Sequence, residues 1–106
     1  METPTLHLNL RKKWFDMIAS GEKQEEYREI KPYWNRVFGS NIKIKGKYYH
    51  PSDVQICFSN GYSSDRRQMI VECKHCVTRM GKPEWGAAPD QQYYTLILGN
   101  IISKNF

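Results

Sequence analysis

The sequence predicts an α+β fold, in which a small mixed β-barrel is accompanied by two or three short helices. Three observations support this prediction. Apolar residues alternate with polar ones in much of the chain, apolar residues at helical spacing are confined to two short N-terminal segments, and no repeat or low-complexity tract is visible. The 106 residues suffice for one hydrophobic core, so we expect a single domain over residues 1–106.

A strand followed by a helix is expected at the N-terminus. The three leucines at positions 6, 8 and 10 alternate with polar residues, which is the pattern of a half-buried strand. The helix that follows should end at Ser20-Gly21, since glycine takes the left-handed conformation without a steric penalty. Its buried face is expected to comprise Leu10, Trp14, Met17 and Ile18, with Phe15 at the margin.

Residues 22–29 are composed almost entirely of good helix formers. The segment nevertheless follows a glycine stop and lacks a helical apolar stripe, so an extended conformation is an alternative. In that case Lys23, Glu26 and Arg28 can converge at the corner between helix and strand. A lysine and an arginine there would bind an anionic or carbonyl-bearing ligand, while Glu26 accepts hydrogen bonds, holds Lys23 or serves as a base. The competing interpretation is a solvated edge strand whose charges pair among themselves.

The rest of the chain is expected to be mostly strands. A second short helix should begin at Pro32 and end at Gly39, with a buried face made of Tyr33, Trp34, Val37 and Phe38. The basic connector 40–52 includes a candidate edge strand protected by lysines. Further strands are expected at about 54–59, 67–77 and 93–102, with a turn at Asn60-Gly61 and a loop rich in glycine and proline at 81–90.

Two surface features are further candidates for ligand contact. Trp85 in the loop 81–90 can offer a stacking platform for a base, with Lys82 near a phosphate; the alternative is that Trp85 plugs one end of the barrel. Tyr62 and the adjacent pair Arg66-Arg67 can extend a nucleic-acid surface, although arginines near a turn are common.

The cysteines and nearby histidines raise the question of a zinc site. Cys73, His75 and Cys76 lie close in sequence, and Cys57 and His50 are the available additional ligands. Residues 73 and 76 of a regular strand point to opposite faces, so they cannot share a metal ion unless a bulge intervenes. We therefore expect no metal and no cofactor.

Composition limits the compartment and the partners. Three cysteines and an N-terminus without a basic and apolar leader favour reduced thiols in the cytoplasm. The longest apolar run has three residues, Leu96 to Leu98, so no membrane span is expected. The net charge of +5 is compatible with a phosphate-bearing partner, although a binder of long RNA is expected to have a broader basic face.

The run from Leu6 to Arg28 resembles the start of an ASCH domain (activating signal cointegrator homology). The hallmark of that family, Gly-x-Lys-x-x-Glu-x-Arg, is matched by Gly21, Lys23, Glu26 and Arg28. The segments 58–62, 81–86 and 94–99 also resemble small ASCH proteins of bacteria and their phages. The resemblance implies a PUA-like β-barrel whose hallmark residues line a cleft, and RNA or a nucleotide-like small molecule as the partner.

The resemblance also implies enzymatic activity as an alternative. Some ASCH proteins are reported as ribonucleases, and one as an amidohydrolase that deacetylates N4-acetylcytidine. In that amidohydrolase the hallmark lysine acts with a threonine three residues later and a more distant glutamate. Lys23 matches the lysine, but Glu26 occupies the place of the threonine and has no hydroxyl to act as a nucleophile. Glu84 and Glu72 are the candidates for the distant glutamate.

Three functions follow from these patterns as hypotheses. The first is an RNA- or nucleotide-binding module, with Lys23, Glu26, Arg28, Tyr62, Lys82 and Trp85 as the ligand contacts. The second is a hydrolase of modified nucleosides or RNA, with Lys23, Glu26 and Glu84 as catalytic residues, and the third is a protein-interaction domain. A monomer is favoured, and the oligomeric state stays open.

Overall fold

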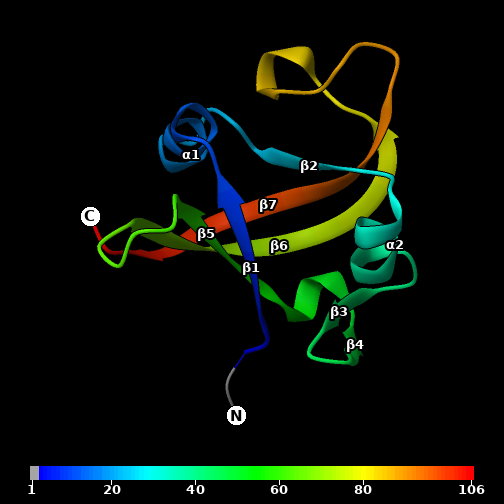
Figure 1. Ribbon diagram of the computed structural model, residues 1–106, viewed down its shortest axis with the longest axis horizontal. Helices are drawn as coiled ribbons and strands as arrows, with labels where there is room; N and C mark the ends of the chain where they lie inside the picture. The colour runs from blue at the N-terminus through cyan, green and yellow to red at the C-terminus, as the bar shows by residue number, and fades with distance from the viewer. Residues whose placement is uncertain (1–2) are drawn as a thin grey trace.

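The computed structural model describes residues 3–106 as a small α+β domain in which one curled sheet forms half of a barrel (Figure 1). The order in the sheet is β1-β5-β6-β7-β2; β1 pairs in parallel with β5, and the other neighbours are antiparallel. The strands of this sheet are β1 Thr5–Leu10, β2 Glu25–Glu29, β5 Gln55–Asn60, β6 Arg67–Met80 and β7 Gln92–Lys104. The predicted α+β class with two short helices is thus confirmed, and the sheet expected to form a small barrel forms half of one.

Two helices and a hairpin complete the fold. Helix α1 (Lys12–Ala19) follows β1, and helix α2 (Pro32–Phe38) follows β2. The basic connector forms a two-stranded hairpin, β3 (Ile42–Ile44) with β4 (Lys47–Tyr49), where the sequence predicted one edge strand. Lys45 and Gly46 both have positive φ angles at its turn, as tight hairpins with a right-handed twist require. Two short 3₁₀ helices, η1 (Pro51–Asp53) and η2 (Pro83–Trp85), lie in the connections.

The core lies on the concave side of the sheet. Alternate residues of each strand point into it, because successive side chains of a strand face opposite sides. Leu8 and Leu10 of β1 are buried there, and α1 adds Phe15 and Ile18. The sheet contributes most of the remainder, including Ile56, Phe58, Met69, Val71, Leu96 and Leu98.

Helix α1 is rotated from the expected orientation. Phe15 is completely buried and Ile18 nearly so, whereas Trp14 and Met17 are only partly buried. The prediction that Phe15 lies at the margin is therefore wrong. Phe15 and Ile18 are one turn apart and pack together on the sheet, which leaves Trp14 at the rim of the core. Likewise Tyr33 is 62% exposed and packs edge-on against Trp34, so the prediction that it is buried is also wrong.

Residues 25–29 form a strand despite their helix propensity. Gly21 has a φ of +84° and ends α1 in the expected left-handed conformation. The chain then runs antiparallel to β7, with Glu26 opposite Leu96 and Arg28 opposite Tyr94. Pairing with an existing sheet edge outweighs a propensity difference of a few tenths of a kcal/mol per residue.

Within the part of the chain that the structure describes, no helix has both the length and the apolar character to span a membrane.

The rotation of α1 can be tested by substitution. Phe15→Ala should lower the free energy of unfolding by about 3–5 kcal/mol, because it leaves a cavity at a site with no exposure. Met17→Ala, at the rim, should cost clearly less. Urea unfolding of both variants and the parent measures the difference. Equal losses would contradict the central position of Phe15.

Candidate functional site

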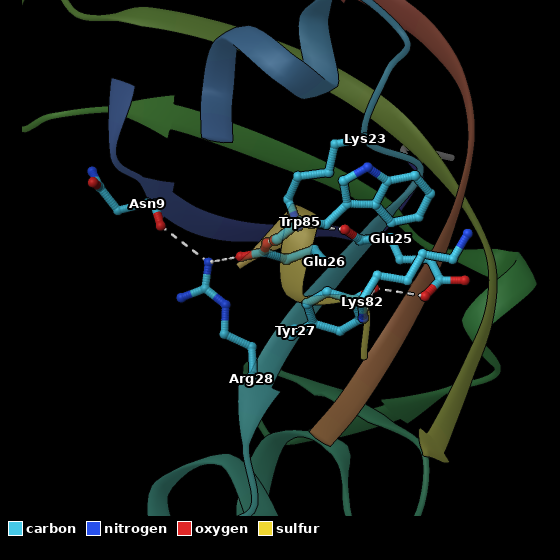
Figure 2. A network of polar contacts seen from close by, with 8 residues as sticks. All are labelled: Asn9, Lys23, Glu25, Glu26, Tyr27, Arg28, Lys82 and Trp85. Carbon is cyan, nitrogen blue, oxygen red and sulfur yellow. Dashed lines mark hydrogen bonds and ion pairs between the residues drawn. The ribbon is translucent and has the colours of Figure 1, made fainter. Parts of the chain in front are cut away.

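A cavity of about 480 Å³ lies between the two edge strands of the half-barrel, β1 and β2. Asn9 and Leu10 line it from β1, and the segment Glu26–Glu29 lines it from β2. We call the gap between these two edge strands the seam. The guanidinium of Arg28 reaches across the seam, and its Nη2 donates a hydrogen bond to the backbone oxygen of Asn9 at 3.0 Å (Figure 2). One arginine side chain thus joins two edge strands that are not neighbours in the sheet.

All three tryptophans of the chain line this cavity. Trp14 comes from α1, Trp34 from α2 and Trp85 from η2, and each is partly exposed. Tyr27 and Tyr93 add two further rings to the lining. Aromatic rings that are left partly exposed around a concave site are surfaces on which planar ligands stack.

A buried charge cluster supports one wall of the cavity. The carboxylate of Glu26 lies between two cations: Oε1 is 3.2 Å from Lys23 Nζ, and Oε2 is 2.6 Å from Arg28 Nη2. Lys23 and Glu26 are only 2% and 6% exposed. The three side chains therefore converge; β2 is an edge strand whose charges pair among themselves, but the prediction that these charges are solvated is wrong. Strict alternation would have put Lys23 on the other face, but β2 begins only at Glu25, so Lys23 is free to turn inward.

Lys23 contributes to this cluster as a tether and does not line the cavity. Besides the carboxylate of Glu26, its ammonium donates to the backbone oxygens of Glu25 and Trp85, the latter at 2.9 Å. An ammonium has three hydrogens, so all of them are used. Burial lowers the pKa of Lys23, and the carboxylate of Glu26 opposes this shift. The result is a fixed link between the start of β2 and the loop that carries Trp85.

Arg28, by contrast, has unused donors at the cavity. Its Nε is buried without a hydrogen-bond partner, and its Nη1 makes no hydrogen bond within residues 3–106. The guanidinium lies over the ring of Trp34, 5.1 Å from the ring centre. A buried N–H without a partner costs free energy, whereas Nη1 is the donor of this guanidinium that stays accessible to a ligand oxygen in the cavity.

The loop 81–90 forms the opposite wall. The backbone nitrogen of Lys82 donates to the hydroxyl of Tyr27 at 3.0 Å, and that hydroxyl donates to Glu25 Oε1 at 2.9 Å (Figure 2). The ammonium of Lys82 lies 4.3 Å from the ring centre of Trp85. Gly86 has a φ of +105°, and a Cβ there would meet the ring of Trp14 at 3.1 Å, so this close approach requires glycine.

The remaining predicted site residues lie elsewhere. Glu84 is exposed on η2, and Glu72 is exposed on β6, where its Oε1 accepts a hydrogen bond from the backbone nitrogen of Asn100. Neither lines the cavity. Tyr62 is 88% exposed and borders a separate hollow beside Asn9.

Sequence reasoning missed the contributions of Trp14 and Trp34, which it assigned to buried helix faces. The sequence did contain a signal for this cavity, because three tryptophans are many for a chain of 106 residues. Their common location depends on how α1 and α2 flank the seam, and helical periodicity alone does not give that.

The thiols are arranged differently from the prediction for a regular strand. Register shifts in β6 between Val71 and His75 turn both Cys73 and Cys76 toward the core. Burial raises the pKa of Cys73 to about 12 and that of Cys76 to about 11, so both are neutral thiols at ordinary pH. In residues 3–106, no group of three or more His, Cys, Asp or Glu side chains is placed to hold a metal ion.

Comparisons of the chain with protein-family models, with curated proteins and with solved structures found no match.

The role of Lys23 as a tether predicts a stability effect. Lys23→Met should lower the free energy of unfolding by about 3–5 kcal/mol, because it breaks a buried ion pair and leaves Glu26 Oε1 and two backbone oxygens without this donor. Lys12→Met, which removes an exposed ion pair with Asp16, is the matched control and should have little effect. Urea unfolding compares the two, and a loss for Lys23→Met no larger than that of the control would refute the tether.

Tyr27 predicts a pH dependence of stability. Burial is the main reason that its pKa is raised from 10.0 to about 12. Its contribution to stability is complete below pH 10 and is lost as the pH rises toward 12, since the unfolded chain gives up the phenol proton first. Urea unfolding between pH 9 and 12 should therefore show a shallower alkaline decline in Tyr27→Phe. A decline identical to that of the parent would assign the pH dependence to other groups.

Proposed function

We propose that the chain is a PUA-like domain of the ASCH type that binds RNA or a nucleotide in the cavity between β1 and β2. The observation that carries this proposal is the combination of three tryptophans with an arginine whose Nη1 makes no hydrogen bond to the described residues. Stacking on aromatic rings and charged hydrogen bonds to carbonyl or phosphate oxygens are how proteins hold unpaired bases and their backbones.

The charge distribution supports the same class of ligand. Arg11 and Arg28 line the cavity beside Glu26 and Glu29. Both acids are already in ion pairs with basic residues, Glu26 with Lys23 and Arg28, and Glu29 with Lys31 at 3.2 Å. The free hydrogen-bonding capacity of Arg28 therefore favours an anion or a carbonyl group over a cation.

Hydrolysis of a modified nucleoside or of RNA is the second candidate, and one observation favours it. Burial lowers the pKa of Lys23, as in lysines that act as nucleophiles. Three further observations weigh against it: all donors of Lys23 are engaged, Glu26 is held between two cations, and Glu84 lies outside the cavity. Both carboxylate oxygens of Glu26 are engaged in ion pairs, so neither is free to take a proton from a substrate. Binding therefore ranks before catalysis.

The third candidate, a protein-interaction domain, has weaker support. The exposed large apolar side chains are distributed over several elements, for example Tyr33 on α2, Tyr48 on β4 and Met80 on β6. A docking surface for a protein would be expected to gather such side chains in one patch.

The test uses the tryptophans as reporters. Titration of the protein with nucleosides, nucleoside monophosphates and short RNA at low salt should change its tryptophan fluorescence, since every tryptophan borders the cavity. Arg28→Gln keeps a hydrogen-bonding group but removes the charge, and it should weaken binding about 10-fold or more. Arg79→Gln, at an exposed arginine paired with Glu25, is the matched control.

Two results would contradict the proposal. One is the absence of any fluorescence change or calorimetric heat with all these ligands at low salt. The other is equal affinity in Arg28→Gln and the parent. Turnover of N4-acetylcytidine or RNA that is lost in Lys23→Met, with folding intact, would instead favour the hydrolase.

A further inference from the structure

Two more hollows lie along β1, next to the cavity between β1 and β2. Asn9 lines both the cavity and a hollow of about 380 Å³. His7 lines that second hollow and also a third one, of about 430 Å³, which Thr5 borders. Thr5, His7 and Asn9 alternate with the leucines of β1, and Leu10 and Leu8 also line the cavity and the second hollow. Strand β1 thus borders all three hollows. We call this feature the β1 track.

Each hollow of the β1 track combines an aromatic ring with a basic side chain. The cavity has its tryptophans and Arg28, the second hollow has Tyr62 and Arg66, and the third has Tyr49 with Lys45 and Lys47. Among the described residues, no acid lines the second or third hollow. The track as a whole is therefore positive, and its charge is spread along its length.

The turn that carries Tyr62 is fixed beside β1. The side chain of Asn9 donates to the backbone oxygen of Gly61 at 2.6 Å, and that of Asn60 donates to the backbone oxygen of Leu10 at 3.1 Å. Gly61 has a φ of +88°, which lets the chain reverse at this point. Tyr62 thus stands exposed at a defined place next to the track, with its ring available for stacking.

We propose that the β1 track holds a single-stranded nucleic acid of about three nucleotides, one for each hollow. This inference rests on the proposed function and specifies its ligand as an oligonucleotide. Asn9 and His7, which join successive hollows, are two residues apart, a rise of about 6.7 Å along a strand. That is about twice the 3.4 Å per nucleotide of a stacked strand, so the spacing fits bases that are unstacked and held separately.

A peptide added as a strand along the free edge of β1 is the competing occupant. It would bind through main-chain hydrogen bonds, and one acceptor of that edge, the backbone oxygen of Asn9, is already used by Arg28. A peptide strand also gives no reason for a basic and an aromatic residue in every hollow. Charge complementarity therefore favours a polyanion with planar groups.

The experiment measures affinity as a function of length. Unlabelled single-stranded RNA pools of one to five nucleotides are titrated into the protein by calorimetry at low salt. Affinity should rise with each nucleotide up to three and then level off. DNA pools of the same lengths form a second arm, and an acidic peptide of equal net charge forms a third.

Substitutions test which hollow binds each successive nucleotide. Tyr62→Ala should weaken dinucleotides and longer ligands about five-fold or more and leave mononucleotides unchanged. Tyr48→Ala, an exposed tyrosine on the other face of the hairpin that lines none of the three hollows, is its control. These side chains are exposed, so the fold is expected to tolerate their loss.

The lysines of the hairpin have their own test. The double variant Lys45→Ala/Lys47→Ala should weaken only trinucleotides and longer ligands. It should also reduce the slope of log affinity against log salt by roughly 1.4, or about 0.7 for each lost phosphate contact. The control variant Lys74→Ala/Lys104→Ala removes the same charge from β6 and β7. It should not weaken trinucleotides more than shorter ligands, and it should not change the salt slope.

The outcomes separate this inference from the proposed function. If mononucleotides bind as tightly as trinucleotides and Arg28→Gln weakens both, the β1 track is refuted while the function stands. If no nucleotide or oligonucleotide binds, both fail. If the acidic peptide binds as tightly as the trinucleotide and displaces it, the track belongs to a peptide and the inference is overturned.

Discussion

The carboxylate of Glu26 is the contact around which the cavity is organised. A buried carboxylate without partners is strongly unfavourable, and here Lys23 and Arg28 compensate it from two sides. Each cation then extends the cluster to another element: Lys23 to the loop with Trp85, and Arg28 to the backbone of β1. The edge strand β2, the loop and β1 are held together by this one group.

The half-barrel explains why this cluster is needed. β1 and β2 are the two ends of the sheet, and the barrel is open between them (Figure 1). Backbone pairing would close this seam and leave no space for a ligand. Side-chain contacts close it only at one point and leave the adjacent surface accessible, lined by aromatic rings from both helices and from η2. Structural support and ligand access thus occur at the same seam.

The elements could largely be predicted from the sequence, because alternation and stop signals are local. The leucines of β1, the glycine after α1 and Pro32 at the start of α2 all act within a few residues. The convergence of Lys23, Glu26 and Arg28 was one of two alternatives predicted for an extended segment at 22–29. The common location of the three tryptophans was not predicted, since it depends on the packing of helices onto a sheet, and neither was the effect of the register shifts in β6 on Cys73 and Cys76.

The tether made by Lys23 has a consequence for how a ligand would enter and leave. The loop with Trp85 is bound to the start of β2 through a buried ammonium, and through the hydroxyl of Tyr27 to the backbone of Lys82. This wall therefore cannot swing open as a lid without breaking the contacts of the buried Lys23 and the hydrogen bond between Lys82 and Tyr27. A ligand would meet a preformed surface, lose little free energy to ordering of the protein, and exchange at a rate set by its own contacts.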